Sequence, residues 1–265
     1  MKKILILFFV LFLIAASLMA QKEDDGIGLT AGLEIGVIDF EDFGDAFYIQ
    51  PMFIFETSFG DLDLYAEAAI PFWFKPDFWI GADIDFSLTY NLFPGSASIL
   101  SFILESWSEI PFIDYKMGTY PGTEFYSELI PGVNFTQEFE GAGDFYAQVD
   151  VPLALTEDPF EFSINLTLGW DSTFGLGLKF VEKNTIKPDA GYGGLNVTFS
   201  MEIASVYYEL EVVIPKKPGL GFTIIPEVDY TLSAFTFYIN AVIDNIGADN
   251  GNVGFGMAAG MKFRY

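Results

Sequence analysis

The 265-residue sequence contains neither cysteine nor histidine. Without cysteine the chain cannot form a disulfide, a thiolate metal site or an N-terminal lipid anchor. Without histidine it cannot form a Ser-His-Asp triad, a Cys-His pair or an imidazole metal site. Paired carboxylates, Asp83 with Asp85 and Glu209 with Glu211, are the acid–base arrangement that remains. Solvated carboxylates are the simpler interpretation of these pairs, so we expect no enzyme, no metal and no cofactor.

Basic residues are also scarce. The sequence has 12 lysines and arginines against 37 acidic residues, which gives a net charge of −25. A protein that binds nucleic acid neutralises phosphates with lysine and arginine. We therefore expect no nucleic-acid partner.

Long hydrophobic runs are lacking after the N-terminus. Met1, Lys2 and Lys3 precede an apolar run over 4–16, which is typical of a secretory signal peptide, and Ala20 is the expected cleavage point. Removal of residues 1–20 takes away two basic residues and changes the net charge from −25 to −27. No linker divides the remainder, so we expect a single domain over 21–265.

Apolar residues are nevertheless abundant, at 51% of the chain, and they alternate with polar residues. In segment 27–37 every odd position is apolar, from Ile27 to Val37, while the even positions hold Gly28, Thr30, Gly32, Glu34 and Gly36. Segments 80–90 and 160–170 show the same period of two. This period predicts strands with one apolar face.

The same reading along the chain predicts an all-β protein with about fourteen strands, within a range of twelve to fourteen. The expected strands are 27–38, 46–59, 62–73, 78–90, 97–107, 125–138, 145–155, 159–170, 173–181, 195–204, 206–215, 220–232, 235–244 and 252–265. Strands of this length suit a transmembrane β-barrel, and an even number is usual for one.

The expected connections alternate in length. Tight joins are predicted at 60–61, 171–172, 204–205 and 233–234, and longer loops at 39–45, 108–124, 182–194 and 245–251. Short periplasmic turns and longer extracellular loops are typical of outer-membrane barrels. Pro71, Pro152 and Pro215 are expected to mark strand ends, because proline lacks the backbone N–H that a strand ladder needs.

Alternation alone also fits a soluble β-sandwich. The apolar positions are almost all large, however, and aromatic residues concentrate near strand ends, which favours a lipid-facing band with aromatic girdles. These aromatic residues are Phe47, Phe59, Phe72, Phe78, Tyr90, Phe160, Trp170, Phe235 and Phe263.

The last predicted strand, 252–265, supports this interpretation. Apolar positions alternate through Met261, Phe263 and Tyr265, and the sequence stops on an aromatic residue. This pattern resembles the C-terminal strand by which the outer-membrane assembly machinery recognises bacterial barrels. The whole segment 21–265 thus resembles bacterial outer-membrane β-barrel proteins as a class, porin-like in kind, and the resemblance identifies no narrower family. The resemblance implies a closed antiparallel barrel in the bacterial outer membrane, with the lipid bilayer and the assembly machinery as partners.

The polar face carries the candidate functional residues, and most of them are acidic. We expect these residues to line a pore: Glu34, Glu67, Asp83, Asp85, Asp150, Glu161, Glu202, Glu209, Glu211, Glu227, Asp229, Lys179, Lys262 and Arg264. An acidic lining concentrates cations and repels anions. The sequence therefore predicts a porin-like channel for passive, cation-preferring diffusion of small hydrophilic solutes.

Two other functions stay open at this point. One is a non-conducting surface protein that binds a partner through loop 108–124, whose aromatic residues include Tyr115 and Tyr120 next to Trp107. The other is a transporter of apolar compounds, which needs an apolar patch inside the barrel and an N-terminal plug. Segment 21–26 is short for a plug, so the channel is the leading hypothesis.

Overall fold

The computed structural model describes residues 27–40, 44–75, 79–93, 96–114, 126–156, 161–187, 191–215, 221–248 and 253–264. All regular structure in these ranges is β, and they contain no helix long and apolar enough to cross a membrane. The elements are β1 (Ile27–Phe40), β2 (Gly44–Phe59), β3 (Leu62–Ala69), β4 (Phe72–Lys75), β5 (Trp79–Leu92), β6 (Ser98–Asp114), β7 (Tyr126–Phe139), β8 (Gly143–Asp150), β9 (Leu153–Ala154), β10 (Glu161–Asp171), β11 (Leu176–Lys187), β12 (Gly191–Ile203), β13 (Val206–Pro215), β14 (Phe222–Leu232), β15 (Phe235–Ile246) and β16 (Gly254–Arg264).

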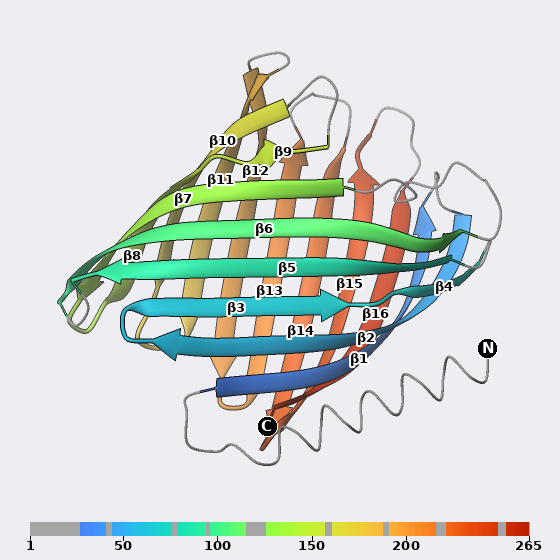
Figure 1. The fold of residues 1–265 in the computed structure, drawn as a ribbon, viewed down its shortest axis with the longest axis horizontal. Coiled ribbons are helices and arrows are strands. Elements are labelled where there is room, and N and C mark those ends of the chain that lie inside the picture. Colours follow the sequence, from blue (N-terminus) through green and yellow to red (C-terminus); the bar gives the residue numbers. More distant parts are fainter. Residues whose placement is uncertain are drawn as a thin grey trace.

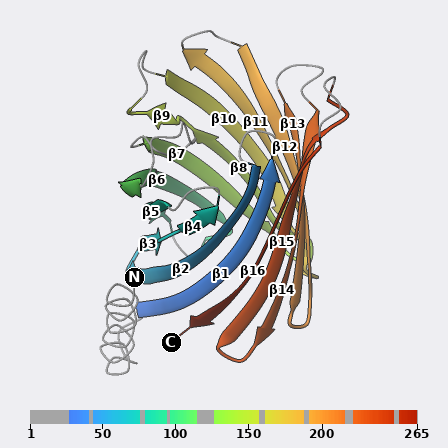
Figure 2. The same cartoon turned by 90° about the vertical axis from the view of Figure 1, so that its right-hand side faces the viewer.

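The strands form one antiparallel sheet that closes on itself. Neighbours in sequence are neighbours in space, and β1 pairs with both β2 and β16 (Figures 1 and 2). The closing ladder is long, from Thr30 opposite Arg264 to Asp39 opposite Phe255. A closed sheet pairs the backbone groups that an open edge would expose, which is what a strand structure needs in lipid.

Fourteen strands span the barrel, because two of them are interrupted. β3 and β4 both pair with β2 and β5, and β8 and β9 both pair with β7 and β10. Each pair is therefore one spanning strand in two pieces. The predicted closed antiparallel barrel and its strand number are confirmed.

The expectation about prolines is correct for Pro215 and wrong for two others. Pro215 is the last residue of β13, but the strands resume after Pro71 and Pro152, as β4 and β9. Both prolines still accept hydrogen bonds through their carbonyl oxygens, from Gly81 N at 3.3 Å and from Ser163 N at 3.0 Å. A proline loses only its donor, so the ladder continues through its acceptor.

The short turns predicted at 60–61, 204–205 and 233–234 are confirmed, whereas the join predicted at 171–172 is a four-residue connection over 172–175. The longer loops were predicted to include residues that belong to strands. Connections at one end of the barrel have two to five residues and those at the other have three to eleven. Segment 108–124 was expected to be a loop, yet β6 continues to Asp114 and β7 begins at Tyr126. Likewise β11 continues to Lys187 and β12 begins at Gly191, so most of 182–194 is strand. Their polar composition suggested loops, but a strand that extends beyond an apolar band meets water on both faces.

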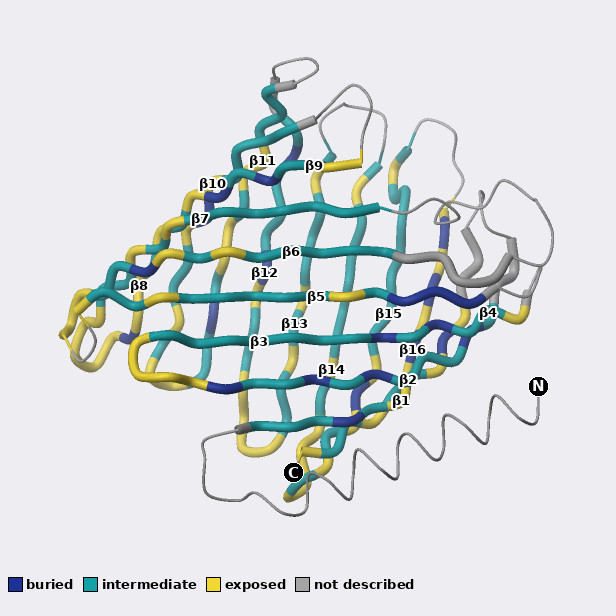
Figure 3. Tube along the Cα trace, in the orientation of Figure 1, coloured by how far each residue is buried: buried dark blue, intermediate teal, exposed yellow. Residues whose placement is uncertain are grey.

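Burial separates this barrel from a soluble sandwich. Most described residues are half-buried (Figure 3), and among them no large side chain is less than 2% exposed. A sandwich packs two sheets over a core of fully buried large side chains. Here the large apolar side chains are exposed instead, for example Leu168 at 62% and Ile239 at 57%.

Candidate functional site

The register of the ladder assigns every described side chain to one of two faces. Leu33, Ile35 and Val37 of β1 are 44–46% exposed and lie on the outer face. Between them Glu34 is directly opposite Gln50 of β2 and Gly260 of β16, on the inner face. The same alternation continues through the other strand pairs, with mostly apolar side chains outside and mostly polar ones inside.

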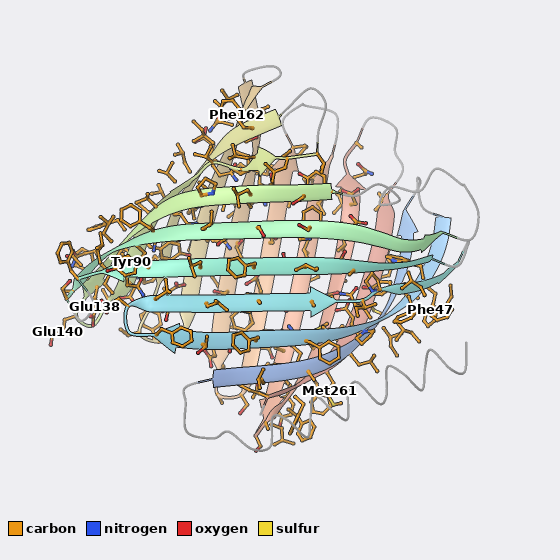
Figure 4. All side chains as sticks on the ribbon, in the orientation of Figure 1. Phe47, Tyr90, Glu138, Glu140, Phe162 and Met261 are labelled. Atoms are coloured by element: carbon orange, nitrogen blue, oxygen red, sulfur yellow. The ribbon has the colours of Figure 1, made fainter. Side chains whose placement is uncertain are left out.

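Aromatic side chains gather at both ends of the outer face. At the short-turn end the ring centroids of Phe139 and Phe145 are 5.4 Å apart, and those of Phe145 and Trp170 are 6.0 Å apart. The indole N–H of Trp170 donates to Ala142 O at 2.9 Å. At the other end Phe47 contacts Phe74 at 5.7 Å. In Figure 4, Tyr90 and Phe47 lie at opposite ends of the wall. Phe78 and Phe160 lie outside the described residues.

The inner face holds the candidate residues that the sequence suggested. The ladder places there Glu34, Glu67, Asp83, Asp85, Asp150, Glu202, Glu209, Glu211, Glu227, Asp229, Lys179, Lys262 and Arg264. The backbone of Glu161 pairs with Ala154 in β10, and its side chain lies outside the description. A role of these inner residues in conduction is a prediction.

Several inner carboxylates accept hydrogen bonds from neighbouring side chains. The Tyr48 hydroxyl donates to Glu34 Oε1 at 2.7 Å, and the Tyr65 hydroxyl donates to Glu67. The amide of Asn196 donates to Glu211 Oε1 at 2.6 Å. These bonds hold the acidic side chains against the wall, which fixes the position of the negative charge.

Sequence reasoning missed part of the acidic lining. Glu105 and Glu109 of β6 and Glu128 of β7 are also inner residues, as are Asp144 of β8 and Asp171 of β10. The β6 residues were missed because Ser106 and Ser108 occupy outer positions and hide the alternation. The remaining signal was the regular spacing of Glu105, Trp107 and Glu109.

The basic inner residues lie close to acidic or aromatic groups. Arg264 Nη2 is 3.2 Å from Glu56 Oε2, an ion pair that links β16 to β2 across β1. Lys262 Nζ lies 5.0 Å from the centre of the Tyr238 ring. The positive charge on this wall is thus partly engaged by the protein itself.

Inner glycines allow large side chains to lie flat on the wall. Tyr48 is directly opposite Gly36, and Tyr238 is directly opposite Gly260. A Cβ on either glycine would collide with the ring. Tyr238 therefore reaches along the wall until its hydroxyl is 4.0 Å from Met52 Sδ, on the far side of β16 and β1.

Of the residues expected to form the assembly signal, Met261 and Phe263 lie on the outer face. Met261 is 39% exposed, and the Phe263 ring packs against Phe235 at 4.7 Å. Tyr265 lies outside the described residues.

The inner face offers no arrangement for a metal ion within the described ranges. No group of three acidic, histidine or cysteine side chains there is placed to hold one.

Comparisons with known proteins found solved structures of low sequence identity. No protein-family model and no curated protein matches the chain. Among solved structures it is similar to a mutant of a porin from Rhodopseudomonas blastica, with 9% identity and a TM-score of 0.49 over 90% of this chain and 100% of the porin. It is also similar to CdiB from Acinetobacter baumannii, with 9% identity and a TM-score of 0.46 over 91% of this chain and 60% of CdiB. The fold is a closed antiparallel β-barrel of fourteen spanning strands, as its own strand ladder establishes.

Proposed function

We propose that this protein is an outer-membrane channel through which small hydrophilic solutes diffuse passively, with a preference for cations. The observation that carries the proposal is the division of one closed barrel into an apolar, exposed outer face and an acidic inner face.

The outer face supports a position in a bilayer. Monomeric soluble proteins rarely expose apolar patches larger than a few hundred Å², whereas this barrel exposes large apolar side chains on nearly every spanning strand. Phe47 and Phe59 lie near the two ends of β2, 12 residues apart. At about 3.3 Å per residue and a tilt of about 40°, this spacing corresponds to a height of roughly 30 Å, close to the apolar band of such barrels.

The arrangement of the outer and inner faces also supports a location in the bacterial outer membrane. Barrels of this kind are proteins of the bacterial outer membrane, which agrees with the expected signal peptide over 1–20 and with the assembly pattern at Phe263. The partners we propose are therefore the lipid bilayer, the assembly machinery and the diffusing solutes.

The inner face supports the preference for cations. On β3, β5, β6, β7 and β8 the inner positions hold ten acidic residues, and these strands contain no lysine or arginine. The ten are Asp63, Glu67, Asp83, Asp85, Glu105, Glu109, Glu128, Glu138, Asp144 and Asp150. Charges of one sign along a low-dielectric wall raise the local concentration of counter-ions. This part of the barrel wall thus favours the entry of cations.

Channel activity is tested by single-channel recording of refolded residues 21–265 in a planar bilayer under a KCl gradient. We expect stable current steps and a reversal potential that is shifted toward the equilibrium potential of potassium. The triple change Asp83→Asn, Asp85→Asn and Glu109→Gln should lower the ratio of potassium to chloride permeability by about threefold or more. The matched control is Glu182→Gln, which neutralises an exposed acid on the outer side of β11 and should leave this ratio unchanged. A barrel that inserts without current, or equal selectivity in all three proteins, would contradict the proposal.

The described structure gives no comparable support to a transporter of apolar compounds. An apolar group does exist on the inner face, formed by Met52, Ala69 and Tyr238. These side chains are only 3–5% exposed, so they pack against one another and offer no surface to a solute.

A further inference from the structure

Aromatic residues are divided between the two faces by chemical type. The outer face carries most of the phenylalanines, whereas the described part of the inner face carries none. Its aromatic residues are Tyr48, Tyr65, Trp73, Trp107, Tyr126, Tyr146, Tyr207 and Tyr238. Tyrosine and tryptophan combine a π face with a polar group, so they suit a wetted surface that also contacts organic groups.

Two of these inner rings form a pair. The centroids of Trp107 on β6 and Tyr126 on β7 are 5.0 Å apart, with 53° between the ring planes. Both residues are half-buried at inner positions of the wall, so neither is fully covered by its neighbours. Tilted rings at this distance leave π faces that a small ligand can contact.

Carboxylates lie directly across the strands from this pair. Asp85 of β5 and Glu128 of β7 are both opposite Trp107, one on each side. Glu109 is opposite Tyr126, and Asp83 is opposite Glu109. Four acidic side chains on three adjacent strands therefore surround two aromatic rings.

We propose that Trp107, Tyr126 and these four carboxylates form a binding site for organic ammonium ions inside the barrel. The inference rests on the proposed function in one respect: the ligand reaches the site through a water-filled interior. An ammonium ion gains from both parts of the site, because aromatic faces attract cations and the carboxylates supply the opposite charge. A neutral solute gains nothing from the excess of charge, and a strongly hydrated metal ion gains little from the rings.

Binding is measured by isothermal titration of the refolded barrel in detergent with tetramethylammonium chloride, against sodium chloride at the same ionic strength. We expect tetramethylammonium to bind more tightly than sodium. The double change Trp107→Leu and Tyr126→Leu keeps all four carboxylates and should raise the Kd for tetramethylammonium about tenfold.

The matched control removes two rings from the outer face of the same strands. Phe102 and Phe135 are 49% and 46% exposed on β6 and β7, and changing both to leucine should leave the Kd unchanged. Should the inner double variant not refold, Trp107→Phe keeps a ring of weaker cation affinity and should raise the Kd about threefold.

Two results would overturn the site: tetramethylammonium binding no tighter than sodium binding, or the same Kd in the wild type and in the inner variants. If a barrel that shows either result still conducts potassium, the proposed channel is supported and the proposed binding site is rejected. If tetramethylammonium binding depends on Trp107 but the barrel carries no current, the binding site is supported and the proposed channel is rejected.

Discussion

At the scale of single residues, glycine and tyrosine act together on the inner wall. Gly36, Gly169 and Gly260 each lie under the ring of the tyrosine directly opposite, on three different strand pairs. None of the three requires a positive φ. These glycines are needed because a ring occupies the space of their missing side chain, which makes each pair one packing unit.

Gly260→Ala should therefore destabilise the barrel. The new methyl group would displace the Tyr238 ring, which is only 5% exposed, and overpacking of this kind costs about 1–3 kcal/mol. The measurement is the free energy of unfolding in urea, with the protein in lipid vesicles. In a Tyr238→Leu background the same substitution should cost much less, and an equal cost in both backgrounds would contradict the pairing.

At the scale of strands, the two interrupted strands share one design. Ile70 N donates to Pro51 O at 2.9 Å, and Val151 N donates to Pro131 O at 2.9 Å. In both places the residue before the interrupting proline thus bonds to a second proline on the preceding strand. Residues 64–72 (LYAEAAIPF) resemble residues 145–153 (FYAQVDVPL), so the interruption belongs to a repeated segment.

Replacement of Pro71 tests how much this interruption costs. Pro71→Ala supplies an N–H on the side of Gly81, and the new hydrogen bond should contribute about 0.5–1.5 kcal/mol. Loss of proline also raises the conformational entropy of the unfolded chain, which lowers the free energy of unfolding by about 0.4–1 kcal/mol. The free energy of unfolding should thus change by less than about 1 kcal/mol, while hydrogen exchange at residue 71 becomes slow. Fast exchange at residue 71 in the folded variant would show that the ladder stays open there.

The sequence predicts strands well where one face is uniformly apolar, as in β1 and β10. It fails where outer positions are polar, as at Ser106 and Ser108, because the period of two is then lost. It also fails where a strand extends beyond the apolar band, as in the last residues of β11. The inner face was predictable from alternation, but the contact between Trp107 and Tyr126 depends on the register of β6 with β7, which no local pattern encodes.

At the scale of the whole molecule, closure depends on the first and last strands. β16 pairs with β15 over ten residue pairs and with β1 over another ten. Without β16 both β1 and β15 would present open edges, whose unsatisfied backbone groups cost several kcal/mol each in lipid.

Deletion of residues 254–265 should accordingly prevent refolding into vesicles. The measurement is the mobility of unheated protein in SDS gels, where a closed barrel migrates differently from the unfolded chain. Phe263→Ala, which keeps the ladder, is the matched control and should still give the folded band. A folded band from the deletion variant would mean that β1 and β15 can close the barrel directly.

Because the number of spanning strands is even, both termini of the barrel lie on the same side of the membrane. β1 begins and β16 ends beside each other, with Thr30 opposite Arg264, at the end of the barrel that carries the short turns. Epitopes fused ahead of β1 and after β16 would therefore face one compartment, and an epitope inserted between β6 and β7 would face the other. In intact cells an antibody would reach either the first two or the third, which makes the orientation of the barrel a question that three tags can answer.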